Sequence, residues 1–264
     1  MRYEKGSIEI SSTRDVPLMQ QVLRSGFATG VQLFEFMKCE NCEYSREAFY
    51  HRLRRLVRRG LVKKGDGLAQ PVYWISELGA SFLVGQGELY AGRSGTETAK
   101  RNFLHWLELN DVHLALRKSD ILVQWVPASE ICSQNDLTKF GFAKDYDAVV
   151  TVNCRGAHVT FALEHERTAK REAEYAEIGN RIERDLHIQT VLYLAATDHL
   201  MYCLRDRFAP KRKVICVALM QEFQRCLLQT PVMLAGSYSQ PVMFEDILMH
   251  EVAAETSSRN PATF

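Results

Sequence analysis

The segment from Ser45 to Gly60 has the clearest pattern of apolar and polar positions in the chain. Its apolar residues recur at i, i+4, i+7 and i+8, the spacing of a single helical face: Phe49, Leu53, Leu56 and Val57. The opposite side of the same helix carries polar and basic residues: His51, Arg54, Arg55 and Arg58. We therefore expect a helix with one buried face and one face directed to solvent or to a charged partner.

Shorter patterns flank this helix on both sides. Helical apolar spacing over Val16–Leu23 and Val31–Met37 predicts two preceding helices. Gly60 is expected to end the basic helix, and two short strands with a glycine-containing turn are expected after it: Leu61–Lys64, Gly65-Asp66-Gly67 and Pro71–Trp74. A further helix is expected after Ser76, with Ser76 as its cap. This order is typical of a winged-helix DNA-binding domain, which we predict over residues 1–84.

The distribution of charge supports the same interpretation. Between Arg46 and Lys64 there are eight basic residues and one acidic residue, whereas the whole chain has a net charge of only +1. An ordinary solvated helix face is the alternative, but such a face usually mixes both signs. We therefore expect double-stranded DNA to be bound by this helix and hairpin. The candidate DNA-binding residues are Arg46, Tyr50, His51, Arg54, Arg55, Arg58, Lys63 and Lys64.

The rest of the chain predicts a second domain. The glycine-containing segment 85–98 has few apolar residues and is expected to be a linker. Strand-like and helix-like segments then alternate, which predicts an α/β domain over residues 99–252. The polar residues 253–264 are expected to form a flexible tail.

Composition limits the cellular setting. No run of about 18 apolar residues occurs and no hydrophobic signal segment begins the chain, so neither a membrane span nor export is expected. Seven scattered cysteines, an odd number, favour free thiols in a reducing cytoplasm. Cys39 and Cys42 have CxxC spacing, but no second pair completes a zinc site, and a loop between two helices is the favoured interpretation.

Carboxylates in the second domain offer the candidate chemistry. Asp147 opens a predicted strand and Glu164 closes the next, so a hairpin would bring both to one end of the sheet. This layout resembles the PD-(D/E)xK nuclease fold, in which two such acids hold a divalent metal and a lysine two residues after the second acid helps to activate water. Glu166 stands where that lysine is expected, and we expect Lys170 to be the only nearby lysine that could replace it.

A second resemblance covers most of the chain. The predicted winged helix, the segments His105–Val112 and Tyr146-Asp147-Ala148, and the segment Phe161–Thr168 resemble the replication-relaxation family of plasmid and mobile-element proteins. Relative to that family, Tyr146 replaces a proline, Glu166 replaces an aspartate, and the glycine before Thr168 is missing. The resemblance implies DNA binding in the replication, transfer or transcriptional regulation of a plasmid, phage or other mobile element.

Two classes of function follow. The first is a homodimeric, cofactor-free DNA-binding protein whose nuclease-like domain does not cut and serves dimerisation or a protein partner. The second is a magnesium-dependent endonuclease with Asp147 and Glu164 as metal ligands and with Glu166 and Lys170 completing the catalytic set. Plain ion pairing of Glu164, Glu166 and Arg167 at a strand edge is a third interpretation of the same residues. Of the two classes we favour the first, and we expect no cleavage of DNA.

Overall fold

The chain is of mixed α and β class, and the computed structural model describes residues 10–66, 70–88, 90, 103–139 and 141–259. It divides into two compact units, Met1–Asn110 and Asp111–Phe264. The division falls inside a helix, α6 (Phe103–Lys118). The linker predicted at 85–98 lies largely outside the described residues, as do parts of the predicted turn at 65–67 and of the tail at 253–264.

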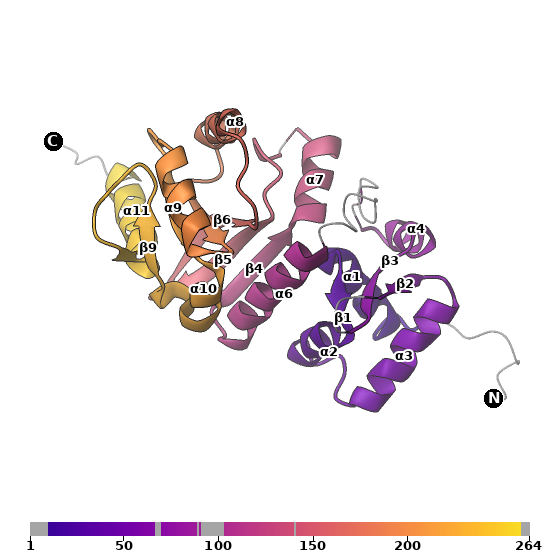
Figure 1. Ribbon diagram of the computed structural model, residues 1–264. Helices are drawn as coiled ribbons and strands as arrows, with labels where there is room; N and C mark the ends of the chain where they lie inside the picture. Colours follow the sequence, from indigo (N-terminus) through magenta and orange to yellow (C-terminus); the bar gives the residue numbers. More distant parts are fainter. Residues whose placement is uncertain (1–9, 67–69, 89, 91–102, 140, 260–264) are drawn as a thin grey trace, which may run out of the picture. The chain divides into compact units, whose positions relative to one another are not determined.

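The first unit consists of helices around a small sheet (Figure 1). Its three strands are antiparallel in the order β1-β3-β2. In chain order the elements are α1 (Asp15–Ser25), β1 (Ala28–Thr29), α2 (Gly30–Cys39), α3 (Arg46–Arg58), β2 (Val62–Gly65), β3 (Val72–Ile75), α4 (Glu77–Gly85) and the start of α6. The predicted helices and hairpin are confirmed to within a few residues at each boundary.

Helix α3 buries the face that its sequence predicts. Ser45 caps the helix, with its Oγ accepting a hydrogen bond from Ala48 N at 3.2 Å. Phe49, Leu53 and Leu56 are buried in the core of the first unit. The apolar stripe therefore fixes the rotation of α3 about its own axis.

Helix α4 begins at the predicted serine cap. Ser76 Oγ accepts a hydrogen bond from Gly79 N at 2.9 Å, and it also lies 2.9 Å from Leu61 O. The backbone of residue 79 also lies so close to Leu61 that only glycine fits there, because a Cβ at this position would lie 2.1 Å from Leu61 O. The cap and the glycine together join α4 to the start of the hairpin.

The second unit contains a seven-stranded sheet in the order β10-β9-β8-β7-β6-β5-β4. Its strands are β4 (Leu122–Pro127), β5 (Ala148–Cys154), β6 (Ala157–Glu166), β7 (Thr190–Ala195), β8 (Val214–Leu219), β9 (Pro231–Leu234) and β10 (Val242–Met243). Strands β4, β5 and β6 form an antiparallel meander, and only β6, β7 and β8 run parallel. The sheet is therefore mixed.

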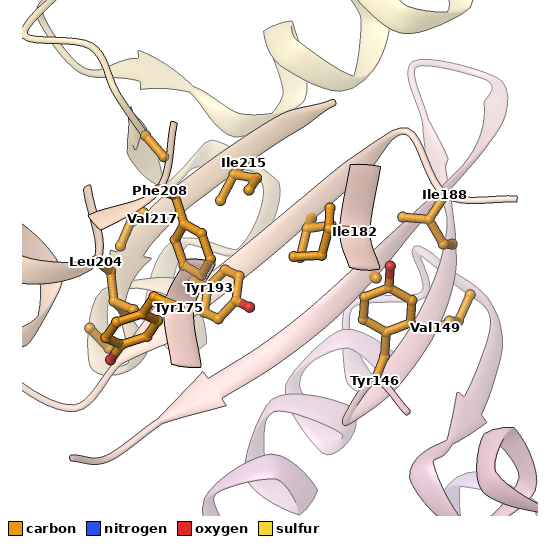
Figure 2. Packing of buried hydrophobic residues seen from close by; sticks show 14 of the residues in the cluster. Tyr146, Val149, Tyr175, Ile182, Ile188, Tyr193, Leu204, Phe208, Ile215 and Val217 are labelled. Atoms are coloured by element: carbon orange, nitrogen blue, oxygen red, sulfur yellow. The ribbon is translucent and has the colours of Figure 1, made fainter. Parts of the chain in front are cut away.

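Helices pack against this sheet along its length. They are α7 (Ala128–Leu137), α8 (Glu172–Arg184), α9 (Asp198–Arg207), α10 (Met220–Cys226) and α11 (Phe244–Arg259), with a short 3-10 turn at Leu227–Gln229. One core contains residues of α7, α8 and α9 with alternate residues of the strands. Figure 2 shows part of it, in which Tyr175, Tyr193 and Phe208 gather at one place. Phe161 precedes Ala162 on β6 and so points to the opposite face of the sheet, where it contacts Phe244 of α11.

All seven cysteines are free thiols, as the sequence predicts. Cys42 lies in the predicted loop before α3, whereas Cys39 is the last residue of α2 and not part of the loop. In the described part of the chain, no helix has both the length and the apolarity needed to cross a bilayer.

Candidate functional site

The solvent face of α3 is basic. Arg54 and Arg58 are exposed, as are His51 and the flanking Arg46. Arg54 Nε donates to Tyr50 O at 3.1 Å, and the Arg46 guanidinium lies 5.9 Å from the centre of the Tyr50 ring. These contacts hold two arginines along the helix without neutralising them.

The neighbouring strand extends this basic surface. Lys63 and Lys64 lie on β2, and both are exposed. Helix α3 contacts β2. Lys63 and Lys64 are successive strand residues, so their side chains leave β2 on opposite faces of the sheet. We call the exposed residues Arg46, His51, Arg54, Arg58, Lys63 and Lys64 the basic face.

Arg55 departs from the predicted arrangement. Helical spacing placed it with Arg54 and Arg58, but its guanidinium turns toward α1 and donates to both carboxylate oxygens of Asp15 at 2.6 Å. Arg52 joins the same network, donating to Asp15 Oδ1 at 3.2 Å and to Glu43 Oε2 at 3.3 Å. Asp15 and Glu43 are buried, so the two arginines neutralise buried carboxylates and fix α3 to α1.

In the second unit the predicted carboxylates occupy one end of the β5–β6 hairpin. Ala148 pairs with Leu163, which puts Asp147 beside Glu164 at the start of β5. Asp147 Oδ2 accepts a hydrogen bond from His165 N at 2.7 Å. Glu164 and Glu166 are alternate residues of β6 and therefore share a face of the sheet with Ala162, a member of the buried core.

Both buried glutamates form ion pairs with lysine. Lys144 Nζ bonds Glu164 Oε1, and Lys170 Nζ bonds Glu166 Oε2. The expectation that Lys170 is the only nearby lysine is therefore wrong. Lys144 lies only three residues before Asp147, but it precedes the strand, and the family pattern places the lysine after the second acid.

A buried aspartate holds the segment that carries Lys144. Asp185 Oδ2 accepts hydrogen bonds from Ala143 N at 3.0 Å and from the Tyr146 hydroxyl at 3.2 Å. The Lys144 ammonium lies 5.1 Å from the centre of the Tyr146 ring. Asp185 therefore anchors the chain on each side of Lys144, and Tyr146, which stands where the resembling family has proline, supplies one of the two anchors.

Glu164 ionises less readily than an ordinary glutamate, although it pairs with Lys144. Burial is the largest cause and raises the pKa of Glu164 to about 7; the Asp147 charge also raises it, while the Lys144 and Lys170 ammonium groups lower it. Tyr193, its partner in register on β7, is fully buried, and among the described residues its hydroxyl has no hydrogen-bond partner. Burial and the nearby glutamates raise the pKa of Tyr193 as well.

These residues do not fit a ready-made divalent metal site. Glu164 and Glu166 each bond an internal ammonium group, and Asp147 bonds a backbone N–H. Over the described ranges, no three His, Cys, Asp or Glu side chains are grouped as metal ligands would be. The arrangement holds two lysine ammonium groups and can exchange a proton at Glu164.

Sequence reasoning missed the internal partners of the site residues. Asp15, Lys144 and Asp185 carry no motif, because each acts on a residue that is distant in sequence or belongs to another element. The local sequence gives no signal either, because Asp15 follows Ser-Ser-Thr-Arg and Asp185 follows Glu-Arg, as exposed acids often do.

Comparison of the chain with protein-family models, with curated proteins and with solved structures finds no match.

Proposed function

We propose that the protein binds duplex DNA through α3 and β2, and that it acts in replication, transfer or transcriptional regulation of a mobile element. The observation that carries the proposal is the basic face. Its cations lie on a helix and an adjacent strand, whereas Arg52 and Arg55 of the same helix are neutralised internally. Cations left to solvent on one side of a helix suit a polyanion.

The order of elements in the first unit supports this proposal. Helix, strand, helix, helix and two-stranded hairpin is the order of a winged helix, in which the helix before the hairpin enters the major groove. Here that helix is α3. Arg54 and Arg58 would reach base edges or phosphates, and Lys63 and Lys64 would contact the backbone. The process is proposed from the resemblance to the replication-relaxation family.

Charge reversal on α3 tests the proposal. The Arg54→Glu/Arg58→Glu variant should lose duplex binding in a mobility-shift assay while its melting temperature stays within a few degrees, because both side chains are exposed. Arg24→Glu/Arg181→Glu is the matched control, since both of its arginines are exposed and lie outside α3 and β2. The assignment of α3 as the DNA-binding helix would be wrong if the Arg54→Glu/Arg58→Glu variant still bound duplex DNA. It would also be wrong if the control variant lost as much binding.

Salt dependence separates the roles of the cations. Replacing Lys63 and Lys64 by Gln should weaken binding to all sequences and lower the slope of log K against log salt by about one unit for each phosphate that the variant no longer neutralises. Arg54→Gln should instead alter the preferred sequence if it reads a base. An unchanged slope in the lysine variant would place β2 outside the interface.

We also propose that the working form is a homodimer. A single recognition helix buries limited area, and specificity at physiological salt commonly uses two half-sites. The second unit would supply the dimer contact or bind a protein partner. Light scattering at tens of micromolar should give about twice the 30.2 kDa chain mass, and a monomer mass would contradict the dimer.

Metal-dependent DNA cleavage is the second candidate function, and the juxtaposition of Asp147 and Glu164 is the observation that favours it. The order α6, β4, α7, β5, β6, α8, β7 is also compatible with a PD-(D/E)xK domain. We favour a unit that does not cut, because Lys144 and Lys170 already neutralise the glutamates.

A plasmid assay decides between the two candidates. We expect no nicking of supercoiled DNA with magnesium or manganese. Nicking that disappears in Asp147→Ala and Glu164→Ala would establish that the second unit is a nuclease. Lys170→Ala would then test whether Lys170 takes the catalytic role of the missing lysine. The mobility-shift assay measures DNA binding through α3 separately, so neither outcome of the plasmid assay affects the DNA-binding proposal.

A further inference from the structure

A cavity in the second unit lies between one side of α8, the end of α9 and the segment that leads into β8. Its volume is about 410 Å³. Tyr175, Phe208 and Ile215 contribute to its lining and are almost completely buried, so they form its floor. Gly179 also lines it and leaves space above Phe208, since a Cβ built there would lie 3.7 Å from that ring.

The rim of the cavity is strongly basic. Four exposed cationic residues line it: Arg184, Arg207, Lys211 and Arg212. Within the described part of the chain, no acidic partner is found for the Arg184 or Lys211 side chain. Arg207 bonds Glu172 at 2.8 Å, but Glu172 is 85% exposed, so water screens that pair and a ligand can displace it.

The single acid in the lining, Glu183, pairs with one of these four cations: Arg212 Nε lies 3.8 Å from Glu183 Oε2. Glu183 Oε1 accepts from Lys211 N at 2.8 Å, and the Glu183 carboxylate also accepts from the N–H groups of Arg212 and Lys213. Its pKa is lowered, because these backbone bonds and the Arg212 charge outweigh the effect of burial. Glu183 thus holds the loop that carries Lys211 and Arg212 through backbone bonds and through its ion pair with Arg212.

We propose that this cavity binds a phosphate-bearing ligand of nucleotide size. Arginine and lysine on several elements can grip a phosphoryl group together, as planar forks and as point charges. The volume lies within the range of small-molecule sites and exceeds what a bare phosphate ion fills. The apolar floor suits a sugar or base, and the rim suits the phosphate. The site is independent of DNA binding by the first unit.

Calorimetry on the full chain tests the site with AMP, ATP, inorganic phosphate, adenosine and a 5′-phosphorylated single-stranded oligonucleotide. We expect AMP or ATP to bind with micromolar affinity and adenosine to bind at least tenfold more weakly. Binding of the phosphorylated oligonucleotide, with loss on removal of its 5′-phosphate, would identify a nucleic-acid end as the source of the same phosphoryl group.

Two variants address charge and shape separately. Arg184→Gln/Lys211→Gln should weaken binding at least tenfold without affecting folding, because both side chains are exposed. Gly179→Leu should block the cavity with no change of charge. Arg181→Gln, on the same helix but outside the lining, is the control and should bind normally.

Three results would overturn the proposal. The first is that no phosphorylated probe binds below millimolar concentration. The second is equal binding of AMP and adenosine, and the third is unchanged binding by the correctly folded charge variant.

Discussion

Arg55 Nη2 donates to both carboxylate oxygens of Asp15 at 2.6 Å, although the two residues are 40 positions apart in the sequence. Asp15 is 1% exposed and also accepts from Arg52 and from Ser11 N. The carboxylate therefore links the start of α1 to the middle of α3. The direction in which the basic face points depends on a residue outside that face.

Replacing Asp15 by Asn should destabilise the first unit. The change leaves two partly buried arginines without their carboxylate, and loss of one partner of a buried pair costs about 3 kcal/mol. Denaturant unfolding measures the effect. Glu177→Gln is the matched control, because the Glu177–Arg181 pair has the same 2.6 Å distance but is exposed and should contribute less than about 1 kcal/mol. Equal effects of the two changes would show that Asp15 is not a structural anchor.

Gly79→Ala should destabilise the same unit through steric overlap. Its Cβ would meet Leu61 O at 2.1 Å, so the backbone must move at a cost of about 1–3 kcal/mol or more. Gly85→Ala in the same helix is the control, since nothing lies within 4 Å of a Cβ there and alanine favours helix by about 0.5–1 kcal/mol. Thermal melting of both variants measures the contrast, and a neutral Gly79→Ala would contradict the close contact.

Glu164 should make the second unit less stable as pH rises toward neutrality. Its pKa is about 7 in the folded chain and near 4.5 ordinarily, so the stability it contributes is fully present below pH 4.5 and is lost as pH rises through 7. Glu164→Gln mimics the neutral form and removes this dependence. Relative to the wild type, the variant should gain up to about 3 kcal/mol between pH 4.5 and pH 8. The free energy of unfolding of Glu172→Gln, which alters an exposed acid, should depend on pH as that of the wild type does. If the free energies of unfolding of Glu164→Gln and the wild type differed by the same amount at every pH, the raised pKa of Glu164 would be refuted.

Lys144→Met should expose a latent affinity for divalent cations. The Lys144 ammonium competes with any metal for the Glu164 carboxylate, and hard oxygen ligands suit manganese once that competitor is removed. Calorimetric titration should show tighter manganese binding than by the wild type or by Lys139→Met, a control at an exposed lysine. Tight binding by the wild type itself would mean that Lys144 does not block the site.

The sequence predicted those parts of the fold that depend on local patterns. The apolar stripe located α3, and Ser76 marked the start of α4. The pattern predicts no individual elements between Leu219 and the tail, where the structure contains α10, β9, β10 and α11. The two strands there have only four and two residues, too few to establish a period.

Long-range pairing accounts for what was missed at the candidate sites. A helical wheel predicts the side of α3 from which Arg55 leaves, but it cannot predict the ion pair with Asp15, because Asp15 lies on another helix. The proximity of Asp147 and Glu164 could be predicted, because it follows from the pairing of two strands joined by a short turn. Lys144 reaches Glu164 through a loop that Asp185, at the end of α8, holds in place, and no spacing rule encodes that contact.

The β5–β6 hairpin also has a consequence for the order of folding. Its turn, Arg155-Gly156, has positive φ at both residues, and Gly156 N donates to Asn153 Oδ1, so the hairpin can close from local contacts alone. Parallel pairing of β6 with β7 must wait for the crossover through α8, which closes a longer loop. We therefore expect pulse-labelled hydrogen exchange to protect the amides of β5 before those of β7. Asp147 and Glu164 would then meet while both are still hydrated, and Glu164 would lose its water only when α8 arrives.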